Sequence, residues 1–179
     1  IYRMIVMGLH LKDGHRITGM LGDPVMQRMF ELGRKAGNIA MRYIEIIRFQ
    51  ELDSGALLAL IDPEADVLAL IAPHFSNRLP LENWMIYDRR RQKAVIHPAG
   101  KGWFLVEEVD ERSVLEAEMS HEEAWYGELW KCFFKTLTIE ARVNQKLQTS
   151  LIPLKYRDFM KEFQNESLRE DCEKCQNKE

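Results

Sequence analysis

The chain has 179 residues, of which 46% are hydrophobic and 30% are charged. This balance is typical of a globular domain with a sizeable core, not of a disordered chain. No apolar run approaches the ~18 residues of a membrane-spanning helix, and the first residues lack the pattern of a signal peptide. Three cysteines are too few for a disulfide scaffold. We therefore expect a cytoplasmic protein with no membrane partner.

Charge is distributed unevenly along the chain. Residues 107–130 contain nine acidic side chains and one basic side chain, for a net charge of −8, and residues 166–179 carry −2. Because the whole chain carries −3, the remaining residues carry +7. A basic face is what binding to a phosphate backbone requires. Chance scatter of solvated surface charge is the alternative explanation.

The first residues of the chain predict two helices joined by a loop. Residues 1–12 have the apolar spacing of the end of a helix. After the loop, a long helix is predicted to begin at Pro24, with Asp23 as its N-cap. Gly33 and Gly37 weaken this helix, and their spacing of four residues predicts that another element packs closely there.

The middle of the chain predicts a sheet with short connections. Apolar, β-branched runs on both sides of Asp53-Ser54-Gly55 predict a hairpin. Residues 64–79 predict one helix or two short ones, because Pro73 removes a helical hydrogen bond. Short connections favour antiparallel pairing. The remaining strands are predicted over residues 83–88, 93–98 and 103–109, with a turn over residues 89–92.

The last part of the chain predicts helices. A capping box begins at Ser120, an apolar stripe follows it, and Pro153 separates the last helix. We therefore expect an α+β fold, with a small, mainly antiparallel sheet of about five strands, covering helices and a C-terminal helical layer. Residues 1–165 would form this single domain, and residues 166–179 a flexible polar tail. The chain starts in mid-pattern without an initiator methionine, so we expect it to be a fragment.

His74 and Asp88 are the candidates for catalysis, because a histidine and an aspartate can form a general acid/base pair. The alternative for His74 is a helix-end residue that bonds to the backbone. The sequence contains no nucleophile elbow, Walker loop or dinucleotide-binding glycine motif. Cys172 and Cys175 have zinc-knuckle spacing, but a single pair of thiols cannot complete a four-ligand site. We therefore expect neither a metal nor a cofactor.

Basic and aromatic residues in two segments are candidates for binding nucleic acid. A basic turn beside an aromatic side chain can hold phosphate while the ring stacks on a base. The alternative is a solvated turn above a tryptophan anchored in the core. Amide side chains on a later helix have donors and acceptors that suit base edges. The alternative is that these residues form the solvent-facing side of the helix, with some capping. The candidates are Arg78, Trp84, Arg89, Arg90, Arg91, Arg142, Asn144, Gln148, Lys155 and Tyr156.

The order and spacing of these segments resemble a bacterial family of unknown function labelled "probable DNA metabolism protein". The resemblance covers about residues 42–163 and includes His74-Phe75, Ile139, Arg142, Asn144 and Pro153. Further matching residues are Arg48-Phe49, Ile61-Asp62-Pro63, Asp66-Val67-Leu68, Arg78, Trp84, Ile86, Asp88, Arg91, Leu129-Trp130, Phe134, Leu147-Gln148 and Tyr156. Gln145 and Arg157 depart from the family pattern, which has proline and tryptophan there.

The resemblance implies a setting in DNA metabolism, because family members occur beside a radical SAM protein of DNA modification, or fused to a uracil-DNA glycosylase-like domain. The resemblance also implies that the family's usual N-terminal portion is missing from this sequence, as expected of a fragment. We expect an accessory module of DNA metabolism or repair that binds nucleic acid, with DNA as the expected partner, a radical SAM protein, or both. One alternative is an enzyme that acts on a nucleic-acid base or nucleotide. Another is a protein-interaction domain that uses the acidic segment 107–123. Pairing of each basic side chain with an internal carboxylate would argue against DNA binding.

Overall fold

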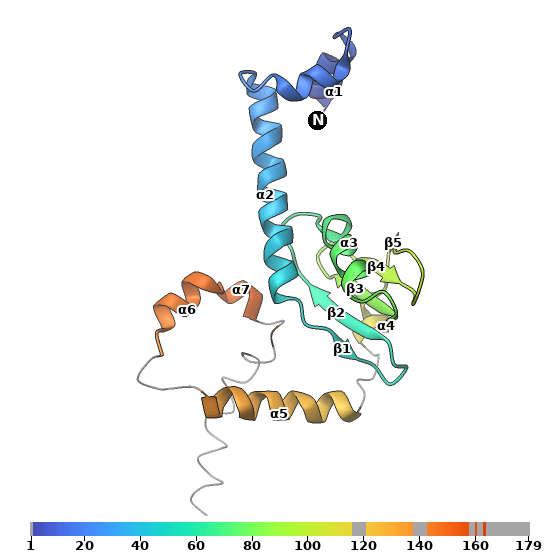
Figure 1. The fold of residues 1–179 in the computed structure, drawn as a ribbon, viewed down its shortest axis with the longest axis vertical. Helices are drawn as coiled ribbons and strands as arrows, with labels where there is room; N and C mark the ends of the chain where they lie inside the picture. The colour runs from blue at the N-terminus through green and yellow to red at the C-terminus, as the bar shows by residue number, and fades with distance from the viewer. Residues whose placement is uncertain (1, 116–120, 138–142, 158–159, 161–162, 164–179) are drawn as a thin grey trace, which may run out of the picture.

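A five-stranded sheet lies beside a long helix that extends well beyond it (Figure 1). The computed structural model describes residues 2–115, 121–137, 143–157, 160 and 163. The helices are α1 (Tyr2–Leu9), the 3-10 helix η1 (Gly14–Gly19), α2 (Pro24–Ile46), α3 (Leu68–Arg78), α4 (Glu111–Leu115), α5 (His121–Leu137), α6 (Gln145–Leu151) and α7 (Leu154–Arg157). The strands are β1 (Gln50–Glu51), β2 (Leu57–Ile61), β3 (Trp84–Asp88), β4 (Lys93–His97) and β5 (Phe104–Val106).

Helix α2 begins where the sequence predicts. The carboxylate of Asp23 accepts hydrogen bonds from the backbone N–H groups of Val25, at 2.7 Å, and Met26, at 3.3 Å. These bonds satisfy donors that have no partner within the helix. The prediction of a close packing partner at Gly33 and Gly37 is wrong, because a Cβ atom at either position would meet nothing within 4 Å. The predicted loop before α2 is also more ordered than expected, since it contains η1.

The predicted fold class is confirmed, and the sheet is mainly antiparallel. The strand order is β1-β2-β3-β4-β5. The predicted hairpin joins β1 and β2, with Gly55 at a φ of 75°, a conformation that suits glycine. The β3–β4 and β4–β5 pairs are also antiparallel. The β2–β3 pair is parallel, with Leu57 opposite Trp84 and Ile61 opposite Asp88, and α3 makes the crossover between the two strands.

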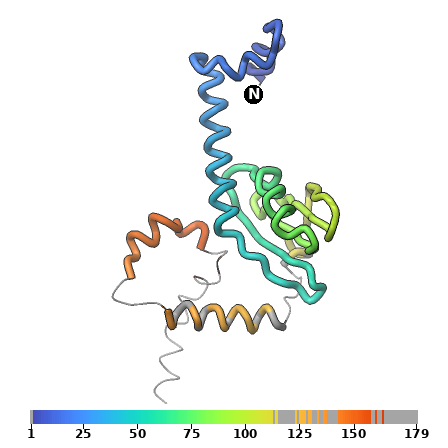
Figure 2. Tube along the Cα trace, in the orientation of Figure 1, coloured from blue at the N-terminus to red at the C-terminus, as the bar shows by residue number. Residues whose placement is uncertain are grey.

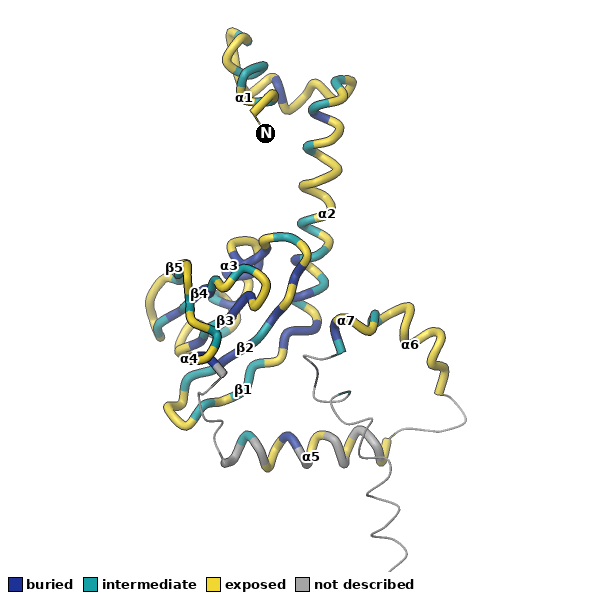
Figure 3. Tube along the Cα trace, turned by 180° about the vertical axis from the view of Figure 1, so that it is seen from behind, coloured by how far each residue is buried: buried dark blue, intermediate teal, exposed yellow. Residues whose placement is uncertain are grey.

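Alternation along β3 sends its side chains into two cores. Trp84 and Ile86 face the main core, which α2 and α3 cover. Tyr87 faces the opposite side and joins a smaller core with Val114 of α4. Helix α3 runs continuously through Pro73. Figure 3 shows burial concentrated in the sheet and in the part of α2 beside it, whereas the rest of α2 is largely exposed.

The C-terminal segment returns to α2. Figure 2 shows α7, which is late in the sequence, beside the end of α2 that adjoins the sheet. The rings of Tyr43 and Tyr156 meet edge to face at 5.4 Å, and Met160 joins the same core. Val143 and Asn144 are not helical, and Asn144 caps α6. The predicted capping box at Ser120, Ile139, Arg142, the Cys172–Cys175 motif and the tail over residues 166–179 lie outside the described residues.

Candidate nucleic-acid interface

The arginine-rich turn between β3 and β4 is organised by the buried carboxylate of Asp88. One oxygen accepts hydrogen bonds from the backbone N–H groups of Arg90, at 3.0 Å, and Arg91, at 3.2 Å. The other oxygen accepts a bond of 2.9 Å from Nη1 of Arg91. The Arg91 guanidinium also donates to the carbonyls of Pro63 and Glu64, each at 2.9 Å. This side chain therefore joins the turn to the loop that follows β2.

The other two arginines of the turn also have carboxylate partners. Nε of Arg89 lies 2.8 Å from Oε1 of Glu111. Arg90 binds both oxygens of Asp62, at 2.8 and 3.3 Å, in the two-point geometry that suits a guanidinium. All three arginines are thus compensated inside the domain. This arrangement argues against the turn as the main phosphate-binding surface.

The predicted acid/base pair is not assembled by any contact. His74 is exposed on α3, where its ring lies edge-on to Phe75 at 5.1 Å. Asp88 is fully buried, and no hydrogen bond or ion pair in the described part of the chain joins it to His74. Burial raises the pKa of the Asp88 carboxyl above its ordinary value, and the hydrogen bond from Arg91 opposes this shift only in part. The hydrogen bonds of Asp88 are therefore with residues of the turn between β3 and β4.

Trp84 lies in the core, which is the alternative that the sequence left open. Its ring is 1% exposed and stacks on the ring of His97, with the planes 3° apart and the centroids at 4.9 Å. Nδ1 of His97 lies 3.1 Å from the carbonyl oxygen of Glu82. Nε1 of Trp84 is buried and has no hydrogen-bond partner among the described residues. Trp84 is therefore not available as a stacking surface for a bound base.

The polar residues predicted near α6 have mainly local partners. Oδ1 of Asn144 accepts a hydrogen bond of 3.0 Å from the backbone N–H of Leu147, as an N-cap does. Gln148 is half-buried within α6. Arg78 is exposed in the last turn of α3 and forms no ion pair with any described residue.

A cleft between α2 and the start of α7 gathers basic side chains that the sequence does not place together. Its volume is about 440 Å³. Lys155 and Tyr156, both predicted as binding residues, lie in its wall. The other lining residues are Glu31, Arg34, Lys35, Asn38, Ile39, Arg42 and Pro153. We call this site the basic cleft, because its lining contains four cations and one carboxylate.

The wall that α7 contributes is fixed by contacts across the cleft. Nη1 of Arg42 donates a hydrogen bond of 3.2 Å to the carbonyl of Leu151. The Tyr43–Tyr156 contact anchors α7 to the core, and Nζ of Lys155 lies 5.1 Å from the centroid of the Tyr156 ring. Burial raises the pKa of Tyr43 well above its ordinary value, and the neighbouring Tyr156 adds to this shift. Tyr43 therefore stays neutral.

Two carboxylates outside the lining, Glu45 and Glu64, partly compensate the basic cleft. Oε2 of Glu45 lies 3.5 Å from Nη1 of Arg42. Oε1 of Glu64 lies 2.7 Å from Nζ of Lys155, and Oε2 lies 3.7 Å from Nζ of Lys35. The hydrogen bond from Lys155, with attraction from both lysines, lowers the pKa of Glu64. The same hydrogen bond raises the pKa of Lys155. Arg34 has no hydrogen bond or ion pair with any described residue, so its charge is uncompensated.

Residues Arg34, Asn38 and Arg42 follow one another at intervals of four along α2. This spacing puts them on one helix face. The sequence therefore contained a signal for this wall of the cleft, but no local pattern indicates that α7 lies opposite.

A family model with the description "Domain of unknown function (DUF4130)" matches residues 1–162. The chain belongs to this family. No curated protein and no solved structure matches the DUF4130 chain. In the part of the DUF4130 chain that the structure describes, no three His, Cys, Asp or Glu side chains are grouped as a metal site would need. None of the described helices has both the length and the apolarity to cross a bilayer.

Proposed function

We propose that this domain is an accessory module of DNA metabolism that holds the backbone of a nucleic acid in the basic cleft. The observation that supports the proposal is the composition of the cleft. Four cations and one carboxylate line it, and that carboxylate, Glu31, is itself paired with Arg28 at 3.0 Å. Phosphate contacts supply most of the sequence-independent affinity for nucleic acid.

The cleft is a better candidate than the arginine turn because its positive charge is less compensated. Each arginine of the turn has its own carboxylate partner within 3.0 Å. In the cleft, Glu64 is shared by Lys35 and Lys155, and Arg42 lies 3.5 Å from Glu45. Arg34 has no carboxylate partner among the described residues. A phosphate that enters the cleft therefore meets unbalanced charge.

The two alternative functions have less support. An acid/base enzyme would use His74 and Asp88, but Asp88 already accepts three hydrogen bonds within the turn. A docking surface on the acidic segment would use Glu107 and Glu111, but both are paired at 2.8 Å, with Lys93 and Arg89 respectively. The radical SAM protein remains a proposed partner that rests on the family resemblance alone.

Fluorescence anisotropy with a labelled single-stranded DNA oligonucleotide at several salt concentrations tests the proposal. Each neutralised phosphate adds about −0.7 to the slope of log affinity against log salt concentration. Engagement of about three phosphates thus gives a slope near −2. We expect Arg34→Gln to reduce the magnitude of the slope by about 0.7 and to weaken binding at low salt.

Arg78→Gln is the matched control, because Arg78 is an exposed arginine outside the cleft with no ion pair to a described residue. This variant should bind as the wild type does. Equal weakening in the two variants would mean that only overall charge matters, and the cleft assignment would then be wrong. If the wild type binds neither single- nor double-stranded DNA at low salt, the proposed function is wrong.

A further inference from the structure

Helix α5 exposes an unusually large apolar surface. The aromatic and leucine side chains of α5 that the structure describes are 45–62% exposed, although apolar patches of this kind are rare on a soluble domain unless they bind something. Exposed side chains of this set are Trp125, Tyr126, Leu129, Trp130, Phe133 and Leu137.

Part of this surface forms a pocket with the connection between α2 and β1. The pocket has a volume of about 650 Å³, within the usual range for ligand sites. We call it the aromatic pocket. Its side chains are those of Arg48, Phe49, Tyr126, Leu129, Trp130 and Phe133. Trp125 and Leu137 belong to the same exposed surface but lie outside the pocket lining.

The wall opposite α5 is held by the main core. The ring of Phe49 contacts Phe75, at a centroid distance of 5.2 Å, and Trp84, at 6.1 Å. On α5, the rings of Trp130 and Phe133 lie 5.8 Å apart with their planes 33° apart. Aromatic faces thus come from two separate elements, one of which is anchored in the fold.

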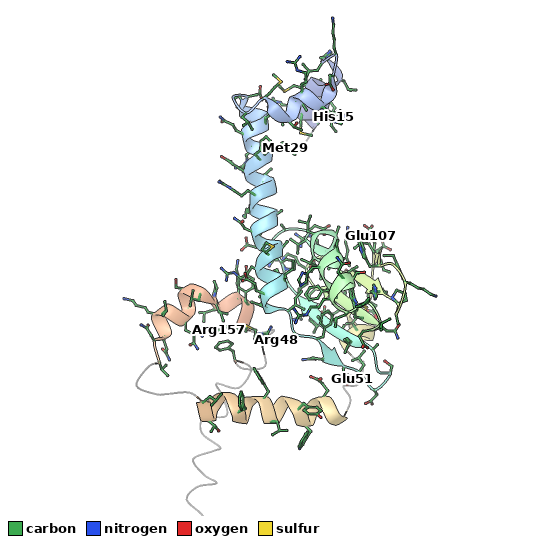
Figure 4. The ribbon with its side chains drawn as sticks, in the orientation of Figure 1. His15, Met29, Arg48, Glu51, Glu107 and Arg157 are labelled. Atoms are coloured by element: carbon green, nitrogen blue, oxygen red, sulfur yellow. The ribbon has the colours of Figure 1, made fainter. Side chains whose placement is uncertain are left out.

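A positive charge adjoins this aromatic surface. Figure 4 shows Arg48 at the connection between α2 and β1, above α5. Nη1 of Arg48 donates hydrogen bonds to the carbonyls of Glu45 and Ile47, at 3.4 and 3.3 Å, which hold the guanidinium at the pocket. Four of the five apolar side chains in the lining are aromatic, and aromatic rings suit stacking on a planar base.

We propose that the aromatic pocket receives an unpaired base of a single-stranded nucleic acid. This inference rests on the proposed function, in which the basic cleft holds the backbone. The pocket would stack the base on its rings. A partner protein that covers α5 would instead be expected to use Trp125 and Leu137 as well, since both are exposed on the same helix.

The test compares two oligonucleotides of equal length and charge, an oligothymidylate and one with abasic sugars throughout. Stacking of one base on an aromatic side chain contributes roughly 1–3 kcal/mol, which corresponds to about 5- to 150-fold in affinity. We expect the wild type to bind the oligothymidylate at least about fivefold more tightly. Trp130→Ala should remove this preference, and Trp130→Phe should retain most of it.

Trp125→Ala is the matched control, because it removes a tryptophan of α5 that is 57% exposed, against 45% for Trp130, and does not line the pocket. It should keep the full preference for bases. Equal loss in Trp125→Ala and Trp130→Ala would indicate a broad docking face and would overturn the inference. Equal binding of the two oligonucleotides would overturn the inference but leave the cleft proposal standing, whereas no binding of either would refute both.

Discussion

Replacement of Asp88 by alanine tests whether this buried carboxylate organises the arginine turn. Asp88 has no exposed surface and accepts three hydrogen bonds. In Asp88→Ala, the backbone N–H groups of Arg90 and Arg91 lose their side-chain acceptor. The Arg91 guanidinium loses one acceptor but keeps the carbonyls of Pro63 and Glu64.

The expected cost follows from these groups. A buried donor without a partner costs about 1–3 kcal/mol. The side chain of Arg91 is 23% exposed and keeps two acceptors, so its share is small. We therefore expect Asp88→Ala to lower the free energy of unfolding by about 2–4 kcal/mol, near the range for breaking a buried ion pair.

Asp88→Asn should cost much less, about 1 kcal/mol or below, because asparagine keeps an acceptor for the two backbone N–H groups. Burial raises the pKa of Asp88 in the folded state, so the protonated form is favoured by folding. The contribution of this pKa shift to stability is present below the unfolded pKa and is lost as pH rises through the folded pKa. Wild type should therefore lose stability relative to Asp88→Asn as pH rises over this interval.

Urea unfolding followed by circular dichroism measures all three proteins. Asp53→Ala serves as the control, because it removes an exposed aspartate from the other hairpin turn. The reasoning is refuted if Asp88→Ala unfolds within about 1 kcal/mol of wild type. It is also refuted if Asp88→Asn is as unstable as Asp88→Ala.

Three further predictions concern stability. Gln92→Gly should stabilise the domain by about 0.5–1 kcal/mol in urea unfolding, because Gln92 has a φ of 53°, and no gain would contradict this. Glu64→Gln should weaken the dependence of the melting temperature on pH at both the acidic and the basic end of the curve. The lowered pKa of Glu64 gives stability that is lost as pH falls through its folded value, and the raised pKa of Lys155 gives stability that is lost as pH rises through its folded value. An unchanged profile would count against this pair. Trp84→Phe should lower the free energy of unfolding by only about 1 kcal/mol, because phenylalanine lacks the buried Nε1 donor, which has no partner among the described residues. A loss above about 3 kcal/mol would show that the packing of the larger ring dominates.

The elements with local signals were predictable from the sequence. Asp23 and Pro24 mark the start of α2, Gly55 marks the first hairpin, and the alternation of Trp84 and Tyr87 gives the two faces of β3. These features depend on capping, turn conformation and strand periodicity, each of which involves residues close in sequence.

The arrangements that depend on distant residues were not predictable in the same way. Periodicity does not specify strand partners, so the parallel β2–β3 pair was not identified within the mainly antiparallel sheet. The spacing of Gly33 and Gly37 suggested a packed neighbour, but no described residue lies within 4 Å of a Cβ atom at either position. The basic cleft requires contact between Arg42 and Leu151, which are 109 residues apart, and nothing local in the sequence indicates that contact.

The exposed part of α2 has a consequence for hydrogen exchange. At 1.5 Å per residue, its 23 residues span about 34 Å. Ala40, Tyr43 and Ile46 are buried against the sheet, whereas most side chains from Pro24 to Asn38 are exposed. Amide protons near the N-terminal end should therefore exchange through local fraying, and those near Tyr43 only through global unfolding. One continuous helix would thus show a gradient of protection along its length.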